Sequence, residues 1–133
     1  MANVTNIQTL VDGPRNVVVK VTGILDTSDV TLATLIDPAL LSAVDIAGSV
    51  PTRLIIDKIS YNIESGLAVN LYWDATTDIL ITSLASSGDD ICSYEYGGLY
   101  NNAGTGVTGK ILYSTQGWAG TVSFNVILQC RKK

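Results

Sequence analysis

An alternation of apolar and polar side chains with a period of two residues runs through this sequence and restricts it to β structure. The clearest example covers residues 67–74, where the apolar positions are Leu67, Val69, Leu71 and Trp73. Residues 17–21 and 122–128 carry similar patterns. Successive side chains of a strand point to opposite faces of its sheet, so each pattern predicts a strand with one buried face. We therefore assign Trp73 to the core.

Turn residues divide the rest of the chain into further strands. Clusters of Gly, Pro, Asp and Ser at residues 12–14, 64–66 and 86–90 mark turns. The predicted strands cover residues 17–22, 30–36, 53–64, 67–74, 79–84, 91–96, 110–115 and 121–131. Short strands separated by frequent turns predict an all-β fold. We expect an antiparallel β-sandwich or jelly roll of about eight or nine strands, as a single domain over residues 1–133.

Two of the predicted strand regions carry more detail. Within residues 53–64 the apolar positions change phase at Asp57-Lys58, which predicts a β-bulge or an exchange of sheets. Residues 110–115 and 121–131 are expected to pair as a terminal hairpin with Trp118 at its tip.

Residues 38–48 form the one segment that favours a short helix. Pro38 suits the first turn of a helix, Asp37 is placed to cap it, and Gly48 is a stop signal. The fold is therefore expected to contain at most one short helix.

The composition excludes several classes of function. The sequence has no histidine, which removes the commonest general base and a common metal ligand. Its net charge of −4 provides no basic field for nucleic acid, and no apolar run approaches the roughly 20 residues that cross a bilayer. We therefore expect a protein that is not an enzyme, with no metal, cofactor, nucleic-acid or membrane partner. With 47% hydrophobic and 15% charged residues, it is expected to bury surface as a homo-oligomer, a dimer or trimer.

Residues 104–110 resemble a nucleotide-binding loop in sequence. They read Gly-Thr-Gly-Val-Thr-Gly-Lys and match both GxGxxG and the first part of G-x-x-x-x-G-K-[ST]. A phosphate loop needs Ser or Thr after the lysine and a helix that begins at the loop. Ile111 occupies that position and residues 111–115 favour a strand. We interpret the motif as a glycine-rich β-loop that binds neither ATP nor NAD.

Other reactive side chains have structural interpretations. Five acidic residues could gather near adjacent loops, but they lack the spacing of a calcium loop: Asp74, Asp78, Asp89, Asp90 and Glu95. Carboxylates on turns are usually solvated or bonded to their own backbone. Cys92 and Cys130 lie in predicted strands and are expected to be buried free thiols.

Three segments of the chain resemble a known family. They are LYWDATTD at 71–78, YGGLYNNAGTGVTG at 96–109, and the last strand, which ends in Arg131-Lys132-Lys133. This pattern, over about residues 53–133, resembles small virion proteins of tailed bacteriophages, nearest to the jelly-roll capsid cement (decoration) proteins of podovirus-like phages. The resemblance implies a homo-oligomer that binds the outside of the assembled major capsid protein lattice and clamps neighbouring subunits. It identifies no binding residues.

Candidate contact residues come from exposure and charge instead. They are Leu40 and Leu41 in the helical segment, Trp118 at the hairpin tip, and the basic residues Arg131, Lys132 and Lys133, whose end of the chain is expected to fray. We expect synthesis in the host cytoplasm and a final location on the outer capsid surface of the virion. A carbohydrate- or receptor-binding jelly roll is the main alternative and would require Trp118 or several tyrosines exposed on one face. A head–tail or tail component is a further alternative and would require ring oligomers.

Overall fold

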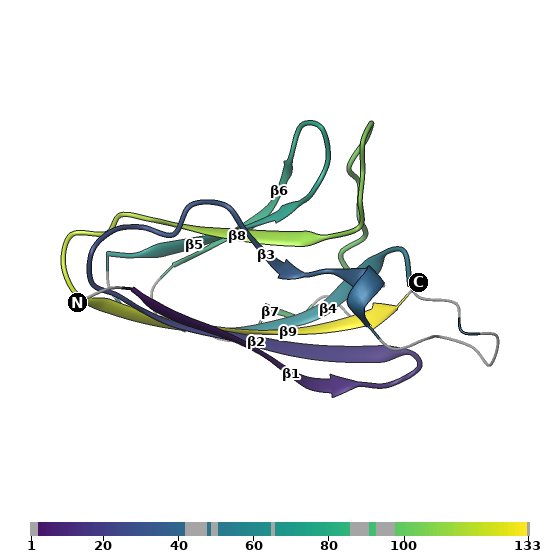
Figure 1. Ribbon diagram of the computed structural model, residues 1–133, viewed down its shortest axis with the longest axis horizontal. Coiled ribbons are helices and arrows are strands. Elements are labelled where there is room, and N and C mark those ends of the chain that lie inside the picture. The colour runs from purple at the N-terminus through teal and green to yellow at the C-terminus, as the bar shows by residue number, and fades with distance from the viewer. Residues whose placement is uncertain are drawn as a thin grey trace.

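The computed structural model describes residues 3–41, 48, 51–64, 66–85, 91–92 and 98–132. They form two packed layers of antiparallel strands (Figure 1). In chain order the elements are β1 (Val4–Asp12), β2 (Asn16–Leu25), β3 (Ala33–Ile36), the 3-10 turn η1 (Pro38–Leu40), β4 (Leu54–Ile63), β5 (Ala68–Trp73), β6 (Ile79–Ala85), β7 (Ile91–Cys92), β8 (Ile111–Gln116) and β9 (Val122–Lys132).

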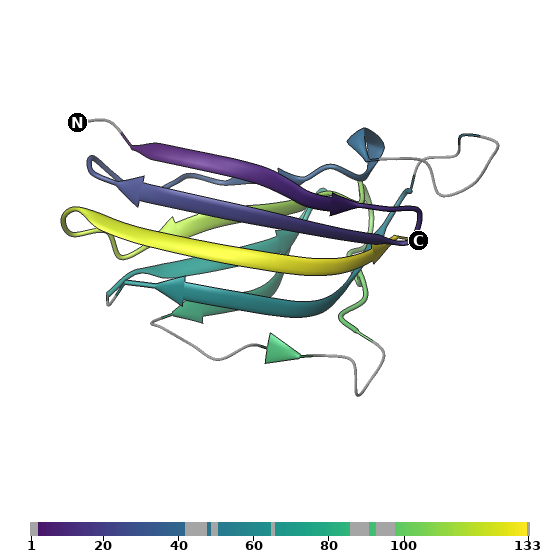
Figure 2. The same cartoon turned by 90° about the horizontal axis from the view of Figure 1, so that it is seen from below.

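The strand order identifies the fold. One sheet has the order β1-β2-β9-β4-β7 and the other the order β3-β8-β5-β6. From β2 to β9 every connection except the one between β5 and β6 crosses from one sheet to the other, so most strands adjacent in a sheet are distant in sequence (Figure 2). Two four-stranded sheets wound in this way are a jelly roll, with β1 added at one edge. The predicted fold class is confirmed.

The core lies between the two sheets and is built by the predicted alternation. Three side chains of β5 and that of Leu67, the residue before it, point inward and are buried; those in β5 are Val69, Leu71 and Trp73. The five-stranded sheet faces them with Val17, Val19, Val21 and Leu25, with Ile56, Ile59 and Ile63, and with Phe124, Val126, Leu128 and Cys130. Trp73 is 2% exposed, which confirms its assignment to the core.

A β-bulge accounts for the phase change in β4. Its pairing with β9 shifts register between Ile56 and Lys58, which leaves Asp57 as the extra residue. β4 pairs with β9 on both sides of the bulge, so a bulge and not an exchange of sheets is present. Asp57 is 5% exposed, and its carboxylate pairs with Arg131.

The predicted terminal hairpin is wrong. β8 pairs with β3 and β5, whereas β9 pairs with β2 and β4. Residues 117–121 therefore cross from one sheet to the other. Gly117 has a φ of 92°, and a Cβ placed there would lie 2.5 Å from the carbonyl oxygen of Gly66. This crossing needs a glycine in the left-handed region, packed against the end of another crossing.

β1 was not predicted from the sequence because it buries neither face. Residues 4–11 are all exposed, so the strand has no apolar–polar alternation to reveal it. The Asp12-Gly13-Pro14 turn that joins it to β2 was predicted, and Gly13 N–H donates to the carbonyl oxygen of Asn16 at 2.9 Å.

The helical prediction is only partly tested. Residues 38–40 form the 3-10 turn, and Asp37 caps it by accepting a hydrogen bond from Ala39 N–H at 3.1 Å, as expected. Residues 42–47 lie outside the described residues. Gly48 has a φ of 88°, a conformation that favours glycine.

Candidate interaction surface

The two leucines predicted as anchors have different environments. Leu40 is 82% exposed at the end of η1, whereas Leu41 is partly buried and packs against the core. Of the pair, Leu40 alone presents most of its side chain to a partner.

Trp118 lies in the crossing between β8 and β9, so the expectation that it stands exposed at a hairpin tip is wrong. Its side chain is half-buried against the core. The indole Nε1 donates to the carbonyl oxygen of Leu25 at 3.2 Å, and its backbone N–H donates to Asp29 Oδ1 at 3.0 Å. These contacts give Trp118 a structural role at the end of the sandwich, while a role in partner binding stays a prediction.

The basic end of the chain is part of β9, so the expected fraying of Arg131 and Lys132 is wrong. Arg131 Nε donates to both carboxylate oxygens of Asp57, at 2.9 and 2.8 Å. Lys132 Nζ pairs with Asp12, and its N–H donates to the carbonyl oxygen of Arg15 at 2.6 Å. Both cations thus have carboxylate partners within the chain, which weakens them as rim contacts. Lys133 lies outside the described residues.

The glycine-rich loop is bonded to the β5–β6 hairpin. Thr76 N–H donates to the carbonyl oxygen of Thr105 at 3.1 Å, and Thr108 N–H donates to that of Asp74 at 3.2 Å. The Thr108 hydroxyl also donates to Asp74 Oδ2 at 2.6 Å. The loop leads into strand β8 and not into a helix (Figure 1). It therefore lacks the helix N-terminus of a phosphate loop, as the interpretation as a β-loop required.

The acidic and cysteine side chains that the structure describes do not form a metal-binding cluster. Across the described ranges, no three His, Cys, Asp or Glu residues meet in a way that could hold a metal ion. Asp78 accepts a hydrogen bond from Ala75 N–H at 3.1 Å within its own turn. Asp89, Asp90 and Glu95 lie outside the described residues.

The one cysteine side chain that the structure describes is buried. Cys130 is a free thiol, as expected. Burial raises its pKa well above the ordinary value, and the charge of Asp57 raises it further. A thiol held protonated in this way is a poor nucleophile.

The described aromatic side chains do not gather on one exposed face. Tyr113 is buried, Tyr61 and Tyr72 are partly buried, and Tyr100 is exposed by itself in the loop before β8. Tyr94 and Tyr96 lie outside the described residues. The aromatic platform required by the carbohydrate alternative is therefore not formed by the part of the chain that the structure describes.

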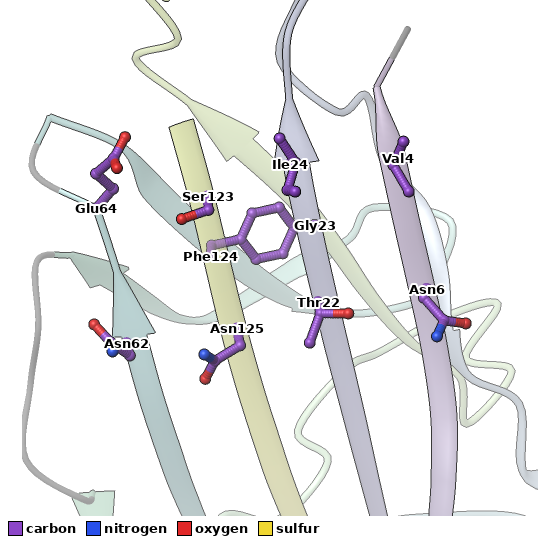
Figure 3. A pocket seen from close by; sticks show the side chains of 10 residues that line it. All are labelled: Val4, Asn6, Thr22, Gly23, Ile24, Asn62, Glu64, Ser123, Phe124 and Asn125. Carbon is purple, nitrogen blue, oxygen red and sulfur yellow. The ribbon is translucent and has the colours of Figure 1, made fainter. Parts of the chain in front are cut away.

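A groove lies on the outer face of the five-stranded sheet. We call it the outer groove; it has a volume of about 410 Å³ and is lined by Val4, Asn6, Thr22, Gly23, Ile24, Asn62, Glu64, Ser123, Phe124 and Asn125 (Figure 3). The strand registers explain how these residues meet. Asn62 is opposite Asn125, Asn125 is opposite Thr22, and Thr22 is opposite Asn6. A polar row thus crosses β4, β9, β2 and β1.

The outer groove offers hydrogen bonds and little charge. Its row contains three amides and a hydroxyl, and Glu64 is the one ionisable residue among those that line it. Ile24 lies opposite Val4 in the next row, and both side chains are exposed. An amide carries both donors and acceptors, so this surface suits a neutral polar partner such as a protein backbone.

An apolar edge continues from the groove along β1. Val4, Ile7, Leu10 and Val11 are between 42% and 57% exposed. Residues 4–11 contain no charged residue and no proline. Natural edge strands are usually protected by such residues or by a covering segment, so β1 has the character of an interaction surface. Sequence reasoning missed both the groove and this edge.

No family model matches the chain, and no curated protein matches it. In the part of the chain that the structure describes, no helix is long and apolar enough to cross a bilayer.

Proposed function

We propose that this chain is a non-enzymatic structural protein of a virion, a capsid cement (decoration) protein that binds the major capsid protein lattice from outside. The observation that carries the proposal is the nearly uncharged outer face formed by the outer groove and β1. Such a face is suited to association with another protein surface. The resemblance over residues 53–133 gives the class of partner.

Cement action requires no chemistry. A protein that binds only the assembled shell stabilises that shell by mass action, by about 2.7 kcal/mol per site when its free concentration is a hundred times its dissociation constant. A rigid jelly roll with an exposed hydrogen-bonding face loses little conformational entropy when it docks.

The experiment compares particles with and without the protein under heating and osmotic shock. We expect depleted shells to assemble but to rupture at a lower temperature. Equal rupture temperatures, or a location of the protein in the tail by electron microscopy, would refute the cement function.

Two variants connect that experiment to the groove. Asn125→Arg places a bulky charge in the middle of the polar row, whereas Leu80→Arg places one on exposed β6 of the other sheet. We expect Asn125→Arg to lower shell occupancy at least tenfold and Leu80→Arg to leave it unchanged. Circular dichroism is used to check that both variants fold. Equal occupancy for the two variants would show that the groove is not the docking face.

Carbohydrate or receptor binding is the second candidate, and the amide row of the outer groove is the observation that favours it. Amide side chains also hydrogen-bond sugar hydroxyl groups. A glycan array probed with the wild-type protein and with Asn125→Arg tests it. Binding that the variant abolishes, together with unchanged particle stability on depletion, would replace the cement function by this one.

A further inference from the structure

The edge of β1 has no neighbour within the described chain. Figure 2 shows β1 at the margin of the five-stranded sheet, with β2 on one side only. Alternate residues of an edge strand direct their N–H and C=O groups away from the sheet, where another strand can bind them. β1 is nine residues long, which is enough for a stable ladder.

Both ends of this edge are held in place. Asn3 Oδ1 accepts hydrogen bonds from the N–H groups of Asp26 and Thr27, at 2.7 and 3.0 Å, and so fixes the start of β1 against the end of β2. Asp12 pairs with Lys132 at the other end. A strand ordered before binding loses less entropy when a second strand pairs with it.

The sequence of β1 is complementary to itself in the antiparallel direction. When Ile7 is placed opposite Ile7 of a second copy, Asn6 faces Gln8, Thr5 faces Thr9 and Val4 faces Leu10. Each pair matches a polar residue with a polar one or an aliphatic residue with an aliphatic one, and cross-strand pairs of these kinds stabilise a sheet. The bulge between Thr9 and Val11 in the pairing with β2 lies at the end of this segment and leaves its centre regular.

Electrostatics permit the same arrangement. The chain carries a net charge of −4, but residues 4–11 carry none. The two copies of Asp12 would lie at opposite ends of the new ladder, each beside its own Lys132. A like-charge contact is therefore absent from the paired segment.

We propose that two copies of this protein associate through β1, antiparallel about a two-fold axis at Ile7, so that their five-stranded sheets become continuous. A two-fold contact of this type uses the same surface on both copies and closes at a dimer. The dimer does not depend on the cement function and is testable without particles.

Sedimentation equilibrium of the wild-type chain and two charge variants tests the surface and its register. The wild type should have twice the chain mass of 14.1 kDa. N6K/Q8K puts like charges opposite each other at two places and should weaken association at least tenfold, whereas N6K/Q8E puts opposite charges there and should keep the dimer. A monomer or a trimer for the wild type, or a dimer retained by N6K/Q8K, would overturn the proposal.

Cysteine crosslinking provides the matched control for register, in a C92S background. In the proposed register the two Cβ atoms at position 7 are about 5 Å apart, close enough for a disulfide after small adjustment. The two copies of Thr9 lie four residues out of register, about 14 Å apart. I7C should form a covalent dimer on mild oxidation and T9C should not. Equal crosslinking of both would refute the register.

Discussion

Replacing Trp118 with alanine tests whether the crossing between β8 and β9 holds the two sheets together. The side chain packs against the core and donates a hydrogen bond to the carbonyl oxygen of Leu25. Truncation of a fully buried tryptophan costs about 3–5 kcal/mol. Because Trp118 is partly exposed, its packing contributes about 2–3 kcal/mol, and the lost hydrogen bond adds about 1 kcal/mol. We expect Trp118→Ala to lower the free energy of unfolding by about 3 kcal/mol.

Urea unfolding measures this change. Trp73, which is 2% exposed, remains as a buried fluorophore in the variant. Trp118→Phe separates the two contributions, since phenylalanine keeps most of the packing but has no donor, and it should cost about 1 kcal/mol. Leu40→Ala is the control on an exposed aliphatic residue and should stay within about 0.5 kcal/mol of the wild type.

The reasoning fails if Trp118→Ala unfolds at the same urea concentration, and with the same slope, as Leu40→Ala. If Trp118→Ala keeps full stability but no longer binds the shell, Trp118 contacts the partner directly.

Three further predictions concern single residues. Arg131→Ala removes the guanidinium whose Nε bonds both carboxylate oxygens of the nearly buried Asp57, and it should destabilise the fold by about 2–3 kcal/mol in urea titrations. Arg131→Lys should be about half as severe. An Arg131→Ala variant as stable as the wild type would show that the pair contributes nothing. Burial keeps the Cys130 thiol protonated in the folded state, whereas the thiol of the unfolded chain, with a pKa near 9.0, ionises above pH 9. Above pH 9 the free energy of unfolding of the wild type should therefore fall about 1.4 kcal/mol per pH unit more steeply than that of Cys130→Ala. Parallel pH profiles for the two proteins would contradict this. Gly106 has a φ of 81° and packs against the β5–β6 hairpin, so Gly106→Ala should lower the thermal midpoint by several degrees, while Gly104→Ala, with open space around it, should not.

The fold could be predicted from the sequence wherever a strand buries one face. The alternation around Trp73 marked β5, and the change of phase at Asp57 marked the bulge in β4. β1 has no buried face, so its apolar residues follow no period of two and local pattern could not reveal it. The sequence predicts a hairpin at Trp118 because a hairpin and a crossing both consist of a strand, a glycine-containing link and another strand. Only the pairing of the sheets distinguishes the two.

The interaction surface depends on contacts that are distant in sequence, and these could not be predicted. Asn6, Asn62 and Asn125 each look like an ordinary exposed strand position until the register places them in one row. The same limit applies to the cations of β9. Arg131 is 74 residues from Asp57 and Lys132 is 120 from Asp12, so their pairing removes the free basic end that composition indicated.

The position of β9 between β2 and β4 also determines when this protein can fold during synthesis. Neither of its two neighbours can complete its ladder until residues 122–132 have left the ribosome, because β9 supplies the pairing for both. Until then the nascent chain exposes two apolar strands with open edges, the kind of intermediate that aggregates or recruits chaperones. Closure of the sheet depends on contacts across most of the chain, which makes slow, late and cooperative folding the expected behaviour.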